Sequence, residues 1–385
     1  MGKIAISESP NAICTGWKPV LRMRNVTIIG AGPAGSTAGF LLAKNGWEVT
    51  IVEQQRFPRD KVCGESVSAL GIEVLGRLGL AGCVEGIGPA RLTRTVLHAM
   101  EGSSVSLMLP RAMWGVSRRA MDRVLLDAAA EAGARVLQPA RCESMNGELV
   151  VRHLADNRIE TLRPSWVLLA DGKGALMPQR PRPTTDFGVK AHFECVDGAR
   201  DAVELFGVRG HYVGLAPIEG GVSNIAFSVP AARLERFRGE FDGLWRQVLS
   251  ENGELASRFI RARRIGGWLA SPLPRFGVAR RWPDKVIPLG NAAAALEPIG
   301  GEGMGLAMRS AELAAGALVH GYATGSPLPV KRLRGQFAKL WRKRRWGCRI
   351  LAKLLGNAAL AGPLLDWAAS DEGVSRRVFA WMGKE

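Results

Sequence analysis

Closely spaced cysteines are missing from this sequence. The six cysteines among its 385 residues are widely scattered, with no C-x-x-C pair and no Cys/His pair at metal-ligand spacing. This distribution argues against structural zinc, an iron–sulfur cluster and a disulfide scaffold. It also argues against a dithiol redox site, which needs two neighbouring thiols. We therefore predict no metal site, and we expect most of the cysteines to be small buried hydrophobic residues.

Long apolar runs are missing as well. No stretch reaches the roughly 18 uninterrupted apolar residues that a spanning helix needs, and the first 24 residues lack the apolar segment of a signal peptide. We therefore expect a cytoplasmic protein. With 47% hydrophobic and 23% charged residues, the composition excludes a disordered chain, and the length fits two packed domains.

Acidic residues are scarce, above all near the C-terminus. The chain has 52 Lys+Arg against 35 Asp+Glu, and residues 326–385 hold 13 against 4, which is 9 of the 17 net positive charges. No acid occurs between Lys331 and Lys353, and apolar residues are interleaved there at helical spacing. We predict that 326–385 is a basic amphipathic helical tail. The candidate partner of this tail is an anionic membrane surface, which would make the protein a peripheral membrane protein. An ordinary packed helix with a solvated basic face is an equally good interpretation of the same pattern. Nucleic acid is the weaker candidate because the tail contains no known binding module.

A dinucleotide-binding fingerprint opens the ordered part of the sequence. An apolar run at 25–30 ends in GAGPAG, and an alanine-rich helical stretch and a second apolar run follow. In such a strand–turn–helix–strand unit, Gly30 makes the tight turn, Gly32 lets a pyrophosphate approach, and Gly35 allows helix–strand packing. Glu53 ends the second run and is placed to bind a ribose diol. Because a carboxylate there repels a 2′-phosphate, NAD or FAD is favoured over NADP.

Two further strand ends point to one large cofactor. The apolar segment 165–172 ends in Asp171-Gly172, and the segment 285–291 leads into a glycine-dense loop followed by an alanine-rich helix. A glycine-dense loop that opens a helix presents free backbone N–H groups to an electron-rich ligand. Three such strand ends with a single fingerprint favour FAD held by a discontinuous domain.

Four motifs together resemble a known superfamily. They are GAGPAG with Glu53, FPRDKVCGES at 57–66, GVSRRAMDRVLLDAAAEAGARV at 115–136 and LGNAAAALEPIGGEGMGLA at 289–307. In order and spacing they resemble the single-domain FAD oxidoreductases that include aromatic hydroxylases, geranylgeranyl reductases and flavin halogenases. The resemblance covers about residues 24–325. It implies an α/β fold with a discontinuous Rossmann-like FAD-binding domain, an inserted antiparallel β-sheet substrate domain and a C-terminal helical segment.

The resemblance and the residue patterns together give expected domain boundaries. The FAD-binding domain is expected at 24–85, 113–183 and 271–325, and the substrate domain at 86–112 and 184–270. The substrate segments alternate apolar and polar residues, and the turn EGG at 219–221 predicts a hairpin between two strands.

By the same resemblance, twelve residues of this sequence are expected to contact FAD. They are Gly30, Gly32, Ala34, Gly35, Glu53, Arg59, Arg118, Asp171, Asn291, Gly303, Met304 and Gly305. Asn291 stands where the family usually has an aspartate, and its amide still offers hydrogen bonds to the ribityl hydroxyls. The start of the helix at 303–305 is expected against the pyrimidine edge of the isoalloxazine, where a helix N-terminus stabilises negative charge on reduced flavin.

Two enzymatic interpretations are compatible with the sequence. The chain has no second dinucleotide-binding fingerprint and hence no dedicated NADPH domain, so we expect NADH or NADPH to act as an external electron donor. We favour an NAD(P)H-dependent monooxygenase of secondary metabolism, in which a flavin hydroperoxide hydroxylates an apolar aromatic or quinol-like metabolite. The alternative is a reductase of C=C bonds in a lipid-like substrate. Against it, Glu65 replaces the second glycine usual in reductases, and Tyr212-Val-Gly-Leu-Ala-Pro217 lacks their Y-x-W-x-F-P pattern. Halogenation is disfavoured because the W-x-W-x-I-P stretch is absent. A redox-gated docking flavoprotein is the non-catalytic alternative.

Candidates for the chemistry lie in loops expected near the flavin and on the substrate sheet. The catalytic candidates are Cys63, Glu65 and Glu302. The candidate substrate contacts are His192, His211 and Tyr212. Nearby Lys and Arg residues would favour a thiolate at Cys63, although a buried thiol is the alternative. Each glutamate is either a proton carrier or an acid at a helix start, and single histidines on such strands are more often structural.

Overall fold

The computed structural model describes residues 24–173, 176–177, 186–274, 276–369 and 373. Small parts of the segments predicted above lie outside the described residues. They are 174–175 and 178–183 of the FAD-binding segment, 184–185 of the substrate segment, 275 near the start of the last FAD-binding segment, and 370–372 and 374–385 of the tail.

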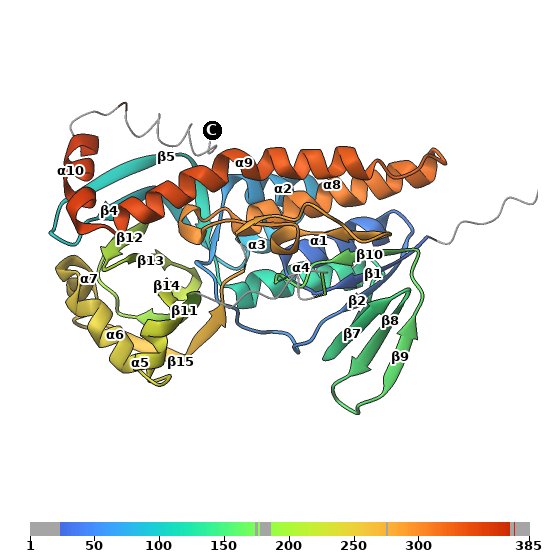
Figure 1. The fold of residues 1–385 in the computed structure, drawn as a ribbon, viewed down its shortest axis with the longest axis horizontal. Coiled ribbons are helices and arrows are strands. Elements are labelled where there is room, and N and C mark those ends of the chain that lie inside the picture. The colour runs from blue at the N-terminus through green and yellow to red at the C-terminus, as the bar shows by residue number, and fades with distance from the viewer. Residues whose placement is uncertain (1–23, 174–175, 178–185, 275, 370–372, 374–385) are drawn as a thin grey trace, which may run out of the picture.

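A five-stranded parallel sheet carries the dinucleotide fingerprint (Figure 1). Its order is β17-β10-β1-β2-β6, from β1 (Asn25–Ile29), β2 (Glu48–Val52), β6 (Arg135–Leu137), β10 (Trp166–Leu169) and β17 (Val286–Pro288). The central strands β1, β10 and β17 are buried on both faces, with helices on one face and a smaller antiparallel sheet, described below, on the other. The chain leaves β1 towards β2 on one side and adds β10 on the other. The carboxyl end of β1 is therefore a topological switch point, the usual place for a cofactor.

Three helices cover this sheet. They are α1 (Pro33–Lys44), α4 (Arg118–Glu131) and α8 (Gly303–Ala323), and α1 packs against both of the others. Proline at the first position of α1 suits a helix start, because its missing N–H would have no helical partner there. The Ser117 hydroxyl caps α4 by accepting a hydrogen bond from Ala120 N. The buried face of α8 carries Ala311, Ala314 and Ala315, whose small side chains suit close packing. The shorter helices α2 (Ala69–Leu78) and α3 (Ala81–Glu85) lie between α1 and α4 in the chain, and α2 packs on α8.

The second large sheet has eight strands in the order β15-β11-β14-β13-β12-β4-β5-β3. Its strands are β3 (Ser66–Val67), β4 (Ala90–His98), β5 (Ser104–Gly115), β11 (Asp186–Glu194), β12 (Ala202–Val208), β13 (His211–Pro217), β14 (Ser223–Pro230) and β15 (Arg263–Pro272). The predicted hairpin is present: the 3₁₀ turn at Glu219–Gly221 joins antiparallel β13 and β14.

One strand pair departs from the expected antiparallel sheet. β12 pairs with β4 in parallel, so the sheet is mixed. Between β4 and β12 the chain passes through α4, β6 and β10 of the FAD-binding half. A parallel pair needs such a long crossover, whereas antiparallel neighbours can share a hairpin.

Smaller elements complete the two halves. A three-stranded antiparallel sheet and a two-stranded pair lie beside the parallel sheet, and three helices follow β14. These elements are β7 (Ala140–Asn146), β8 (Glu148–His153), β9 (Ile159–Leu162), β16 (Gly277–Val278), β18 (Ala294–Ala295), α5 (Ala231–Arg236), α6 (Phe241–Ser250) and α7 (Gly253–Arg258), with 3₁₀ turns at Gly290–Ala292 and Pro298–Gly300.

The C-terminal segment forms two helices, α9 (Val330–Leu355) and α10 (Ala358–Ala369). In Figure 1, α9 lies along α8 and extends across to the eight-stranded sheet. Leu333, Phe337 and Trp341 pack into the core of the FAD-binding half, whereas Cys348 and Leu355 pack into a core beneath β4 and β5. The helix therefore joins both halves through its apolar face.

Among the described residues, no single helix is long and apolar enough to cross a membrane, while the pair α9 and α10, bent by 111°, meets that test jointly by length and composition.

Candidate functional site

Glycine positions shape a groove at the carboxyl end of β1. A Cβ at Gly30, where φ is +100°, would lie 2.5 Å from the Ala170 carbonyl oxygen, and one at Gly35 would lie 1.8 Å from the Gly30 oxygen. Both contacts are impossible, so these positions require glycine. A Cβ at Gly32 would meet nothing nearer than Arg118 Nη2, at 3.5 Å. The free side of Gly32 therefore faces open space, where a ligand's phosphate can approach the backbone.

Glu53 is fixed at the edge of this groove, which encloses about 560 Å³ and also includes Asp171. Its Oε2 accepts a hydrogen bond of 2.8 Å from Ala31 N, and Oε1 accepts one of 2.9 Å from Gln55 N. The carboxylate is buried, and Arg59 Nε lies 3.6 Å from Oε1. Since each carboxylate oxygen can accept more than one hydrogen bond, Glu53 can also bind a ribose diol.

Two arginines flank Gly32 and share one buried carboxylate. Arg59 Nη1 lies 3.0 Å from Asp122 Oδ2, and Arg118 donates to both oxygens of Asp122 at 2.8 and 2.6 Å. Burial alone would lower the pKa of Arg118, but the charge of Asp122 outweighs it and raises that pKa above its usual value. Asp122 holds both guanidinium groups in place, and Glu53 also faces Arg59, so the two arginines keep fixed N–H donors beside Gly32, which suits hydrogen bonds to a pyrophosphate.

Lys61 lies between the groove and a second cavity, and it lines both. Burial, together with the positive charges of Arg118 and Arg59, lowers the pKa of Lys61 to about 8. An anion bound between these groups would stabilise the protonated amine.

The second cavity, of about 200 Å³, is lined by half of the predicted flavin contacts. They are Gly32, Ala34, Arg118, Asn291, Gly303 and Met304, together with Glu302. The N-terminus of α8 opens here, so its free N–H groups can face a ligand. Gly305 lies elsewhere, because its Cβ would be 2.3 Å from Ser68 Oγ, and it therefore serves close packing of α8 on α2.

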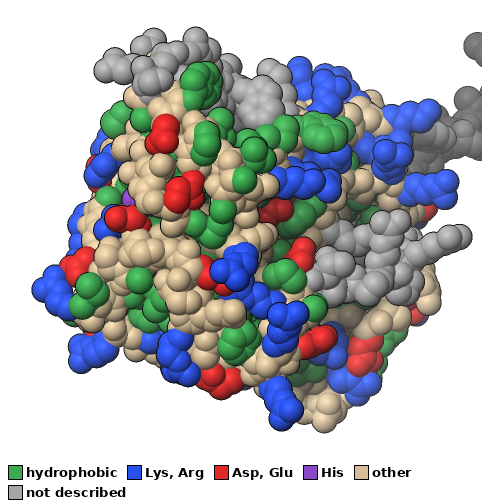
Figure 2. Space-filling view, turned by 60° about the vertical axis from the view of Figure 1, so that its left-hand side comes forward, with side chains coloured by type: hydrophobic (Ala, Val, Ile, Leu, Met, Phe, Trp, Pro, Cys, Tyr) green, Lys and Arg blue, Asp and Glu red, His purple; other side chains and the backbone are tan. Residues whose placement is uncertain are grey.

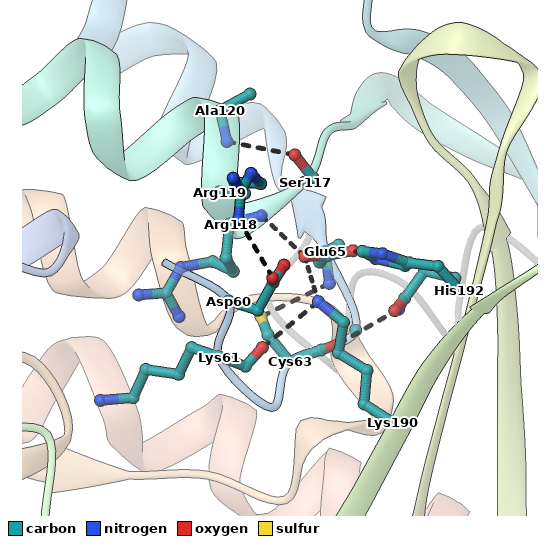
Figure 3. A network of polar contacts seen from close by, with 12 residues as sticks. Asp60, Lys61, Cys63, Glu65, Ser117, Arg118, Arg119, Ala120, Lys190 and His192 are labelled. Carbon is teal, nitrogen blue, oxygen red and sulfur yellow. Dashed lines mark hydrogen bonds and ion pairs between the residues drawn. The ribbon is translucent and has the colours of Figure 1, made fainter. Parts of the chain in front are cut away.

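Glu65 forms a buried cluster beside this cavity (Figure 3). It adopts φ +56°, a left-handed conformation that glycine takes more readily. Its side chain is fully buried; Oε1 pairs with Lys190 Nζ and accepts a 2.7 Å hydrogen bond from Arg118 N, while Oε2 lies 2.6 Å from His192 Nε2. Burial alone would raise the pKa of Glu65, but the His192 hydrogen bond and the Lys190 charge outweigh it and lower that pKa. Glu65 is therefore a fixed carboxylate that anchors the loop before β3.

A third cavity, of about 130 Å³, lies under the eight-stranded sheet. It shares Val62, Cys63 and Gly64 with the second cavity, which we call the flavin-side cavity. The two cavities therefore adjoin across this loop. Apolar side chains dominate its lining, among them Leu97, Leu107, Met113, Leu205, Phe227 and Ile299. Among the described residues that line it there is no Asp, Glu, Lys, Arg or His. This lining suits an apolar ligand held next to the cofactor.

Of the three predicted substrate contacts, Tyr212 lines this cavity. Its hydroxyl donates to Glu297 Oε1 at 3.4 Å, and Glu297 lines the flavin-side cavity. Burial raises the pKa of Tyr212 well above 10 and also raises that of Glu297. His192 instead binds Glu65. His211 hydrogen-bonds the Arg209 carbonyl, and burial lowers its pKa to about 4, so it is neutral at pH 7.

The C-terminal helix α9 also contributes to the site. Trp341 lines the flavin-side cavity and Leu351 lines the apolar one. Arg344 Nε lies 3.5 Å from Glu302 Oε2, so this ion pair ties α9 to the loop before α8. Glu302 is thus engaged by α9, while Cys63 lines both cavities.

Sequence reasoning missed three of these residues: Asp122, Lys190 and Trp341. Asp122 stands four positions after Arg118, the spacing that pairs charges on a helix. Lys190 stands two positions before His192, which places both side chains on one face of a strand. Both signals were present in the sequence, whereas nothing local indicated that Trp341 would reach the flavin-side cavity.

Comparisons with known proteins agree with this geometry. Residues 23–209 match the family model described as an FAD binding domain. The menaquinone reductase of Mycolicibacterium smegmatis is 25% identical over 336 residues, covering 78% of this chain and 77% of its own. The kynurenine 3-monooxygenase of Xanthomonas oryzae pv. oryzae is 26% identical over 318 residues, covering 74% and 69%. The structure of a flavin-dependent brominase matches with a TM-score of 0.78 at 18% identity and covers 93% of each chain.

The residues present fit FAD. The open face of Gly32, the positive groups beside it, the Glu53 carboxylate and the start of α8 follow one another along adjoining cavities. Residues 23–209 match an FAD binding domain, and this match, the arrangement of the site and the fold agree with the resemblance of the motifs to the single-domain FAD-dependent oxidoreductase superfamily.

Proposed function

We propose that this FAD-dependent oxidoreductase is a monooxygenase that hydroxylates an apolar aromatic or quinol-like metabolite, with NADH or NADPH as the external electron donor. The observation that carries the proposal is the apolar cavity, which has no acidic or basic side chain in its described lining and adjoins the flavin-side cavity at Val62–Gly64. Reduced FAD supplies the electrons that split dioxygen. One oxygen atom enters the substrate, the other leaves as water, and one NAD(P)H is oxidised with uptake of one proton.

The protein's part is to hold the substrate and to exclude water. Leucine, methionine and phenylalanine side chains from the sheet would surround an apolar ring. Exclusion of water limits side reactions that would consume NAD(P)H and dioxygen without hydroxylating the substrate. Glu65, fixed by Lys190 and His192, positions the Cys63–Gly64 backbone between the two ligands. The similarity to kynurenine 3-monooxygenase supports this reading of the site.

A second candidate function, reduction of a C=C bond, is favoured by a different observation. Tyr212 lines the apolar cavity, and its hydroxyl donates a hydrogen bond to Glu297. Because burial raises the pKa of Tyr212, this hydroxyl keeps its proton. In this reaction the reduced flavin would supply a hydride to one carbon, and Tyr212 would supply a proton to the other. The similarity to a menaquinone reductase supports this alternative.

Isotope labelling separates the two reactions. The FAD-loaded protein is supplied with NADH or NADPH, isotopically labelled dioxygen, and a panel of short-chain quinols, quinones and amino-substituted aromatic rings. We expect a product that has gained one labelled oxygen atom and that does not form without oxygen. A product that forms anaerobically and has gained two hydrogens would overturn the monooxygenase assignment. In that case Tyr212→Phe should abolish product formation, whereas hydroxylation should tolerate this change.

A further inference from the structure

The outer face of α9 combines positive charge with exposed apolar side chains. Lys339, Arg342, Arg349 and Lys353 are exposed on this face. Trp346 is 53% exposed and Ile350 is 41% exposed. From Lys339 to Lys353 the face extends for about 21 Å at 1.5 Å per residue. Figure 2 shows basic and hydrophobic side chains interspersed along the upper part of the molecule, where α9 runs.

These outer residues are separate from those that α9 uses to pack. Leu333, Phe337 and Trp341 point into the FAD-binding core, and Arg344 faces Glu302. The packing of α9 on the rest of the protein therefore does not depend on the outer residues. An exposed tryptophan and isoleucine with four cations around them are not explained by packing, which would need apolar residues only on the inner side.

We propose that the outer face of α9, formed by Lys339, Arg342, Trp346, Arg349, Ile350 and Lys353, docks on an anionic lipid surface. Charge complementarity identifies the partner as anionic, since no acid occurs between residues 331 and 353. Trp346 and Ile350 favour lipid over nucleic acid, because a tryptophan among cations suits the boundary between headgroups and acyl chains. Because the inner side of α9 lines both cavities, the docked helix would place the substrate site next to the membrane.

The test measures co-sedimentation of the full-length, FAD-loaded protein with vesicles of phosphatidylcholine, alone or mixed with phosphatidylglycerol. One variant changes Lys339, Arg342, Arg349 and Lys353 to Gln. A control variant changes four exposed arginines elsewhere to Gln and so has the same net charge: Arg163, Arg246, Arg261 and Arg263, each 75–76% exposed. A third variant, Trp346→Ser with Ile350→Ser, keeps every charge. FAD content and circular dichroism verify that all the variants fold.

We expect the parent protein to bind the anionic vesicles and not the neutral ones. Since each basic residue near such a surface strengthens binding by up to about fivefold, the four-residue variant should lose about two orders of magnitude or more at low salt. The control variant should lose far less. The serine variant should lose the part of the binding that persists at high salt, where surface charge is screened.

Several results would overturn the proposal. They are absence of vesicle binding by the parent, equal losses in the control and four-residue variants, and tighter binding to duplex DNA than to vesicles. A parent dimer that the serine variant dissociates, without vesicle binding, would assign the face to a second copy of the chain. Because sedimentation requires no turnover, these outcomes are independent of the reaction that the enzyme catalyses.

Discussion

At the scale of single residues, Gly32 and Gly35 should respond to substitution in opposite ways. Gly32 has an ordinary φ of −73° and open space on its free side, so Gly32→Val should fold but fill the path of the pyrophosphate. Gly35→Ala should fail to fold, because its Cβ would overlap the Gly30 oxygen. Absorbance of the reconstituted flavin and circular dichroism measure the two effects. Stoichiometric FAD in Gly32→Val would contradict the assignment of the groove.

Lys61 should make FAD affinity depend on pH. Its pKa is about 8 in the ligand-free protein, and a bound pyrophosphate would raise it, so binding is accompanied by proton uptake at and above that pH. Affinity should therefore be constant below about pH 7 and fall as the pH rises through 8 and beyond. Flavin fluorescence titrations between pH 6 and 10 measure this dependence.

Two variants at position 61 provide the controls for this pH profile. Lys61→Arg keeps the charge and should flatten the profile at high affinity, whereas Lys61→Met should flatten it at low affinity. An unchanged pH dependence in Lys61→Met would assign the titration to another group.

At the scale of elements, the pair Glu65–Lys190 fastens the loop before β3 to strand β11. Glu65→Gln leaves the Lys190 charge buried without its partner, which costs about 3–5 kcal/mol. The double change Glu65→Gln with Lys190→Met removes both charges, so it should cost less than the sum of the single changes. Urea unfolding at pH 7 measures all four proteins, and additive losses would contradict direct coupling.

The same pair predicts how stability changes with pH. The pKa of Glu65 is lowered in the folded protein, so its contribution is complete above the unfolded value of about 4.3. This contribution is lost as the pH falls through the lower folded pKa. The parent should therefore lose more stability than Glu65→Gln when urea unfolding is repeated at pH 4 and pH 3.

Elements and residues differ in how far the sequence could predict them. The strand–turn–helix around Gly30, the hairpin at 219–221 and the long helix after Gly303 follow from local patterns, and the structure contains all three. The Glu65–Lys190 pair and the parallel β4–β12 pairing join positions more than 100 residues apart. No local propensity encodes such partners, because they depend on how the two sheets come together. The same holds for the Tyr212–Glu297 contact, although Tyr212 itself was a candidate.

At the scale of the whole molecule, helix α9 makes the two halves one cooperative structure. Phe337 and Trp341 are buried with the parallel sheet, while Cys348 and Leu355 are buried beneath the eight-stranded sheet. Neither half can release α9 without exposing apolar surface of the other. The flavin-side and apolar cavities are both lined in part by α9, so a ligand bound in either should stabilise the halves and α9 together.

Thermal unfolding should therefore show one transition that FAD shifts as a whole. At a free FAD concentration of about 100 times Kd, binding adds about 2.7 kcal/mol, which for a chain of this size raises Tm by a few degrees. Scanning calorimetry with and without FAD measures this shift, and Gly32→Val should show the same single transition with no shift. Two separate transitions, only one of which responds to FAD, would mean that α9 does not couple the halves. In that case the eight-stranded sheet would unfold independently of the cofactor.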